Sequence, residues 1–123
     1  MYDHIGLQIE NIDASVRFYT GALSALGFGL CSRDASGAGF GAPNAPSLWL
    51  YRAGSEKGMS ARPVHIAFRA PDRASVERFY NLGLSAGGRD NGGPGLRTDY
   101  SPIYYAAFLL DPDGNNIEAV CLR

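Results

Sequence analysis

The chain has 123 residues, a formal net charge of −1, 46% hydrophobic residues and 11% aromatic residues. This length corresponds to one domain large enough for a real core, and the composition is ordinary for a soluble globular protein. Acidic and basic residues are interspersed, so no basic stripe indicates nucleic-acid binding and no cationic amphipathic helix indicates membrane binding. The chain has two widely separated cysteines, Cys31 and Cys121, and shows no signal peptide or membrane span. These features predict a cytoplasmic protein with reduced thiols.

The first half of the chain has the pattern of a strand, a helix and three further strands. Apolar and polar residues alternate over residues 2–9, as in a half-buried strand. Capping residue types precede a helix expected over residues 14–26, and Gly27 ends it. Turn-forming residues separate the strands that follow, which we expect over residues 28–33, 38–42 and 47–52.

The pattern restarts after a polar segment, residues 54–63, which we interpret as a linker. A strand is expected over residues 64–70 and a helix over residues 73–86. Residues 89–102 are rich in glycine and proline and predict a long loop over a site. The last two strands are expected over residues 103–110 and 116–122, on either side of a turn.

A shift of 61 positions aligns the two halves by sequence. Nine of the 24 positions from His4 to Gly27 are then identical, where ordinary composition would give about one or two. A repeat of this quality indicates that one supersecondary unit is used twice. The sequence therefore predicts a single α+β domain of two βαβββ modules, with module one at residues 1–53 and module two at residues 64–123.

The repeat places the two histidines of the chain at equivalent points. On both opening strands the aliphatic side chains point one way, and His4 and His65 point the other way beside the small residues Gly6 and Ala67. In the last strand Ile117, Ala119 and Cys121 take one face, and Glu118 points to the other. If the modules pair, the side chains of His4, His65 and Glu118 meet, and two imidazoles with one carboxylate suit a divalent metal that keeps open positions for a substrate.

The twin modules and the run Asp-Pro-Asp-Gly-Asn-Asn-Ile-Glu at residues 111–118 resemble the vicinal oxygen chelate superfamily. That group includes glyoxalase I, extradiol dioxygenases, fosfomycin-modifying thiol transferases and bleomycin resistance proteins. The resemblance implies paired modules that form a cupped eight-stranded sheet, and a homodimer. It also implies a central metal (Mn²⁺, Fe²⁺, Ni²⁺ or Zn²⁺) held by His4, His65 and Glu118. Trp49 stands where a fourth ligand would be.

The resemblance leaves the reaction open. Trp49 departs from the four-ligand set of glyoxalase I, and Gly6 replaces the threonine that the thiol transferases carry. Ring-cleaving dioxygenases need further histidines, and Phe108 stands where their tyrosine would be. The leading expectation is a metal-dependent lyase, isomerase, dioxygenase or thiol transferase that binds a small oxygenated molecule. The alternatives are a non-catalytic drug-sequestering protein, like the bleomycin resistance proteins, and a small-molecule sensor.

Several polar and aromatic residues are candidates for substrate contacts. Glu118, or a hydroxide on the metal, is the candidate base, and Tyr105 is the candidate phenol for a substrate oxyanion. Arg69 and Arg97 could receive a carboxylate or phosphate, although an exposed salt bridge is an equal alternative for either. The candidate substrate-binding set is Gln8, Trp49, Arg69, Arg97 and Tyr105.

Overall fold

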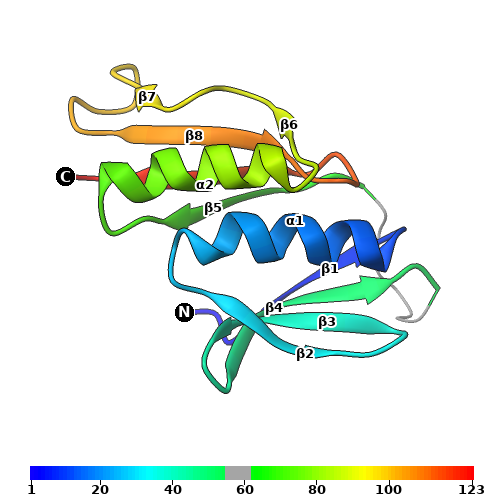
Figure 1. Cartoon of the computed structure of the whole chain (residues 1–123). Helices are drawn as coiled ribbons and strands as arrows, with labels where there is room; N and C mark the ends of the chain where they lie inside the picture. The colour runs from blue at the N-terminus through cyan, green and yellow to red at the C-terminus, as the bar shows by residue number, and fades with distance from the viewer. Residues whose placement is uncertain (55–61) are drawn as a thin grey trace.

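Each half of the chain builds a sheet that packs on its own helix, as the computed structural model in Figure 1 shows for residues 1–54 and 62–123. Module one contributes a sheet with strand order β1-β4-β3-β2, and module two a sheet with order β5-β9-β8-β6, where β7 also pairs with β8. The elements of module one are β1 (Ile5–Ile9), α1 (Ile12–Ser24), β2 (Gly29–Arg33), β3 (Gly37–Ala42) and β4 (Ala45–Arg52). Those of module two are β5 (His65–Arg69), α2 (Arg73–Ser85), β6 (Arg89–Asp90), β7 (Gly95–Leu96), β8 (Tyr105–Leu110) and β9 (Asn116–Cys121).

The predicted α+β class with two related modules is confirmed. In both modules the first strand runs parallel to the last, and the remaining pairs are antiparallel. The predicted linker, residues 54–63, lies mostly outside the described residues, so its boundaries stay a prediction. Among the described helices, none is long and apolar enough to cross a membrane.

The region predicted as a long loop, residues 89–102, is partly strand. Two short strands lie there, and β6 supplies the strand that corresponds to β2 of module one. The N–H of Asn91 donates to the carbonyl of Phe108 at 3.0 Å, and the N–H of Phe108 donates to the carbonyl of Gly92 at 2.8 Å. Glycine and proline lower the local strand propensity, but the free edge of β8 offers these backbone groups partners that the local sequence does not reveal.

The core forms between the sheets and the helices. Ile9, Phe18, Leu50, Phe79 and Ile117 are fully buried, because the alternating strand positions and one stripe of each helix face each other. The helices begin at equivalent caps: the Asn11 side chain accepts from the N–H of Ala14 at 3.0 Å, and Asp72 accepts from that of Ser75 at 2.7 Å.

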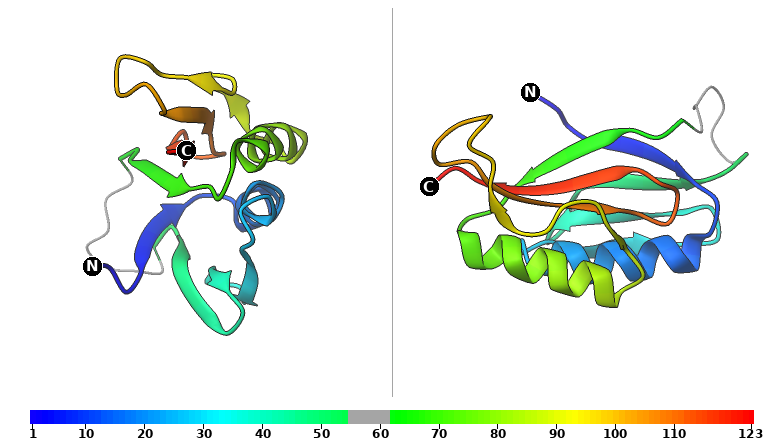
Figure 2. Two further views of the ribbon diagram at one scale, coloured as in Figure 1. Left: turned by 90° about the vertical axis from the view of Figure 1, so that its left-hand side faces the viewer. Right: turned by 90° about the horizontal axis from the view of Figure 1, so that it is seen from above.

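The two modules meet through their helices, which lie side by side in Figure 2 (left). Small residues allow this close approach. A Cβ atom at Gly21 of α1 would lie 2.7 Å from the Cβ of Ala86 at the end of α2, and one at Gly83 of α2 would lie 3.4 Å from the Cβ of Ala22 in α1. The helices therefore lie on one side of the two sheets, and the other side of each sheet carries no helix.

A buried carboxylate also joins the modules. Asp111, in the turn before β9, is fully buried and accepts a 2.5 Å hydrogen bond from the hydroxyl of Tyr19 in α1. The same carboxylate accepts from the N–H groups of Asp113 and Asn115 at 2.9 and 2.8 Å. Burial, and secondarily the charge of Asp111, raise the pKa of Tyr19 well above its usual value. The sequence indicated the turn, but not this contact across 92 residues.

Candidate functional site

Glu118 is the centre of a polar cluster on the helix-free face of module two. It lies in the middle of β9, opposite Ala67 of β5 and Phe108 of β8, and only 2% of it is exposed. Its Oε2 atom lies 3.1 Å from Nε2 of His65. Its Oε1 atom accepts a 2.6 Å hydrogen bond from the hydroxyl of Tyr104. The small side chain of Ala67 leaves space beside the carboxylate for the imidazole of His65.

The contacts of His65 define which of its nitrogens is available. Nδ1 lies 2.9 Å from the backbone carbonyl of Asn116, which can only accept, so Nδ1 carries a proton. In a neutral imidazole Nε2 then presents a lone pair toward the carboxylate of Glu118. Two acceptors 3.1 Å apart repel each other unless a proton or a cation lies between them. A metal-binding histidine usually donates its other ring N–H to a carbonyl or carboxylate in the same way.

Tyr104, rather than Tyr105, is the tyrosine in contact with Glu118. Burial, followed by the hydrogen bond to Glu118, raises the pKa of Tyr104 to about 12, so at neutral pH it remains a donor. Tyr105 faces the helix side of the sheet, where its hydroxyl donates to Glu77 of α2 at 2.9 Å and Arg73 lies over its ring. The sequence indicated that only one of the pair could face the site and favoured Tyr105. In the structure the odd-numbered residues of β8, such as Leu109, face the helix. Tyr105 therefore points to the helix, and Tyr104 points to Glu118.

His4 lies apart from this cluster within one chain. Its Nδ1 atom is 2.6 Å from the carboxylate of Asp3, and its side chain is half exposed. Strands β1 and β5 run in opposite directions (Figure 1). A hollow of about 820 Å³ is lined by the end of β1, including Gln8, and by the residues just before β5, including Val64. His4 precedes the other end of β1, about 13 Å further along at the usual rise per strand residue.

The remaining candidate residues do not gather at one site. Gln8 and Trp49 of module one and the two candidate arginines lie at separate places. Gln8 lines the hollow at the end of β1. Trp49 of β4 is paired with Gly6 and covers Gly39, where an added Cβ would lie 2.8 Å from the indole ring. Arg69 is exposed at the end of β5. Arg97 lies over the ring of Phe108, which in turn stacks on His65, so Arg97 is the candidate arginine that joins the cluster.

One chain brings together two of the three candidate metal ligands, His65 and Glu118. Within residues 1–54 and 62–123, no group of three histidine, cysteine, aspartate or glutamate side chains lies close enough to hold a metal ion. The donor pair of His65 and Glu118 does fit a divalent cation, since a neutral nitrogen and a carboxylate oxygen converge and both are oriented by further hydrogen bonds. Tyr104 and Phe108 complete the surroundings of this pair, and neither contact was predicted.

Comparison with known proteins agrees with the repeat and the topology. The family model described as Glyoxalase/Bleomycin resistance protein/Dioxygenase superfamily matches residues 2–119. The chain belongs to this superfamily. No curated protein matches the sequence of this superfamily member.

Solved structures of similar fold cover almost the whole chain. A glyoxalase/bleomycin resistance protein from Albidiferax ferrireducens T118 superposes with a TM-score of 0.79 at 25% identity, and the match covers 98% of both chains. A glyoxalase-related enzyme from Fulvimarina pelagi gives 0.74 at 20% identity, covering 98% of this chain and 87% of that one. A family enzyme from Burkholderia phytofirmans PsJN gives 0.74 at 16% identity and covers 98% of both.

Proposed function

We propose that this superfamily member is a metal-dependent enzyme that acts on a small oxygenated molecule. The observation that carries the proposal is the contact of His65 Nε2 with Glu118 Oε2 at 3.1 Å, with Nδ1 of the same histidine directed to a carbonyl. This arrangement provides two oriented metal donors on the helix-free face of the sheet of module two. Mn²⁺, Fe²⁺, Ni²⁺ and Zn²⁺ are all compatible with nitrogen and carboxylate ligands.

The residues of the chain have separate tasks in this proposal. A bound divalent cation would supply Lewis-acid chemistry by polarising neighbouring oxygens of a chelating substrate. His65 and Glu118 would hold the cation, and the Tyr104 hydroxyl fixes one oxygen of Glu118 so that the other remains directed at His65. Glu118 would also be the base that accepts a proton from a carbon or oxygen of the substrate.

The third protein ligand in this proposal is His4 from a second copy of the chain. Within one chain His4 lies toward the opposite end of its strand from the His65–Glu118 pair. The repeat nevertheless places each histidine at the start of the first strand of its module, on the face of the sheet that carries no helix. A homodimer that brings module one of one copy against module two of the other would complete two equivalent sites. Gln8, Trp49 and Arg69 would then line the same cavities from either copy.

Metal content and subunit mixing test both parts of this proposal. We expect the purified protein to retain one divalent metal per chain after dialysis, and His4→Ala and His65→Ala to lose it. If ligands come from two copies, co-refolding the two variants restores about a quarter of the wild-type sites, because half of randomly formed dimers contain one intact site. Refolding the double variant with itself is the control.

The outcomes separate the two parts. Metal-free wild-type protein would contradict the enzyme proposal as a whole. Metal in the wild type, loss in both single variants and no recovery on mixing would place all ligands in one chain and contradict only the role of the second copy.

Sequestration of a small molecule without catalysis is the second candidate function. Trp49 favours it, because an indole at the fourth ligand position cannot bind a metal and offers an apolar wall over Gly39. This candidate predicts ligand binding by metal-free wild-type protein that is unchanged in His65→Ala. Quenching of the single tryptophan is a direct readout.

A further inference from the structure

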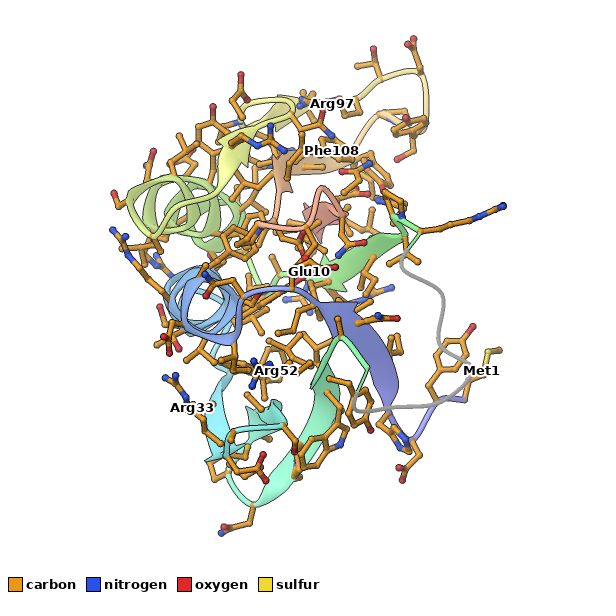
Figure 3. The ribbon with its side chains drawn as sticks, turned by 90° about the vertical axis from the view of Figure 1, so that its right-hand side faces the viewer. Met1, Glu10, Arg33, Arg52, Arg97 and Phe108 are labelled. Carbon is orange, nitrogen blue, oxygen red and sulfur yellow. The ribbon has the colours of Figure 1, made fainter. Side chains whose placement is uncertain are left out.

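Arg97 is held in one place by its surroundings. Its guanidinium lies 5.4 Å from the centre of the Phe108 ring, and its Nη2 atom donates to the carbonyl of Gly93 at 2.6 Å. Figure 3 shows the two side chains together over the sheet of module two. The glycine-rich loop fits closely around the guanidinium: a Cβ at Gly95 would lie 3.1 Å from Nη1, and one at Gly92 would lie 3.3 Å from Nη2.

The same residue is connected to the candidate metal ligands. The backbone N–H of Arg97 donates to the carbonyl of Tyr104 at 2.7 Å, and the hydroxyl of Tyr104 holds Glu118. Phe108 pairs with Glu118 across β8 and β9 and also stacks on His65, with ring centres 6.3 Å apart. Arg97 therefore packs on Phe108, which stacks on His65 and is paired with Glu118. All of these side chains lie on the helix-free face of the sheet, which a substrate would approach.

The charge of Arg97 is not neutralised within the described part of the chain. The ion pairs there involve His4 with Asp3, Arg33 with Asp13, and His65 with Glu118, and none includes Arg97. A neutral carbonyl and an aromatic face orient the guanidinium but leave its positive charge and several N–H donors available. A half-buried, pre-oriented guanidinium of this kind is a receptor for an oxyanion.

We propose that Arg97 forms an anion subsite and that the substrate carries a carboxylate or phosphate group besides its chelating oxygens. The assignment of this anion to the substrate rests on the proposed function, whereas the anion subsite itself does not. The loop of Gly92 to Gly95 is then a positioning element, since it fixes the guanidinium before the ligand arrives.

The first experiment uses metal-free protein, so its result is independent of metal binding. Titrations with sodium benzoate, phenyl phosphate and neutral benzamide are followed by amide NMR. We expect the better anion to bind about tenfold more tightly than benzamide, as for a charge-assisted hydrogen bond. This preference should disappear in Arg97→Gln and persist in the control Arg78→Gln, which lies in α2 and bonds to Ser75.

A second variant tests the loop and covers the case in which Arg97→Gln fails to fold. Gly95→Ala keeps the charge but places a methyl against Nη1, so the preference for the anion should fall at least threefold. Equal affinity for the anions and benzamide in the wild type would overturn the subsite. An unchanged preference in folded Arg97→Gln would overturn it as well.

The last experiment asks whether the anion and the chelating oxygens belong to one ligand. In Zn²⁺-loaded protein we compare catechol with 3,4-dihydroxybenzoate and 3,4-dihydroxyphenylphosphonate. One of the anionic catechols should bind about tenfold more tightly than catechol in the wild type, with no such gain in Arg97→Gln. Equal binding would overturn the combined substrate. A protein that takes up no Zn²⁺ would overturn the proposed function. The titration of metal-free protein with benzoate would still test the anion subsite on its own.

Discussion

The hydroxyl of Tyr104 donates a 2.6 Å hydrogen bond to Oε1 of Glu118, a residue that is almost completely buried. Tyr104 stands just before β8, and Glu118 lies in the middle of β9, so the bond spans two antiparallel strands. It leaves the second carboxylate oxygen directed at His65. This single contact connects the loop that carries Arg97 to the candidate metal donors.

Removing the Tyr104 hydroxyl should weaken metal binding without unfolding the protein. In Tyr104→Phe the carboxylate loses the donor that orients it, and outer-shell losses of this kind reduce metal affinity by about 10- to 100-fold. Competition with a chromophoric chelator measures the change. Tyr100→Phe is the matched control, because it keeps the ring contact with Tyr104 and removes an exposed hydroxyl. Equal losses in the two variants would show that Tyr104 has no special role.

The same hydrogen bond predicts a stability change at alkaline pH. Burial and Glu118 raise the pKa of Tyr104 from 10.0 to about 12 in the folded chain. A group whose pKa is higher in the folded chain stabilises the fold fully at pH values below its pKa in the unfolded chain. This contribution is lost as the pH rises through the pKa of the folded chain. The difference in unfolding free energy between the wild type and Tyr104→Phe should therefore shrink between pH 10 and about 12. Urea denaturation at several pH values tests this, and a constant difference would contradict it.

The repeat supplies a matched pair for the buried Tyr19–Asp111 contact. Tyr19→Phe leaves a fully buried carboxylate short of a donor and should lower the free energy of unfolding by about 1–3 kcal/mol. Tyr80, its equivalent in module two, bonds to Asp90 at an exposed position, so Tyr80→Phe should have little effect. Chemical denaturation of both variants gives the comparison. Similar values would mean that the buried bond adds nothing beyond the exposed one.

Trp49→Glu should add a metal ligand. Trp49 is paired with Gly6 as Glu118 is paired with Ala67, and His4 and His65 each stand two residues before those partners. A carboxylate at position 49 would therefore lie beside His4 as Glu118 lies beside His65. We expect metal affinity to rise at least tenfold, measured by chelator competition. Trp49→Phe is the control for the loss of the indole, and a gain in both variants would refute the ligand explanation.

Local patterns were enough to predict the two helices, the longer strands and the faces of β1, β5 and β9. The alternation in β1 and β5, the caps at Asn11 and Asp72, and the 61-residue repeat each depend on neighbours in sequence. The same patterns placed His65 and Glu118 on one face of module two, and the structure has them 3.1 Å apart. The short strands β6 and β7 were missed because they depend on the edge of β8 and not on their own residues.

By itself the sequence determined the duplicated βαβββ scaffold and the polar residues that each opening strand presents, because side-chain direction in a strand follows from its period of two. Tertiary structure alone decided that Tyr104 and not Tyr105 holds Glu118, that Arg97 lies on Phe108, and that Tyr19 reaches Asp111. It also decided that β1 and β5 run in opposite directions, which separates His4 from His65 within one chain. These relations depend on how the modules pack on their helices, and the packing energy of many distant contacts is not encoded in any local pattern.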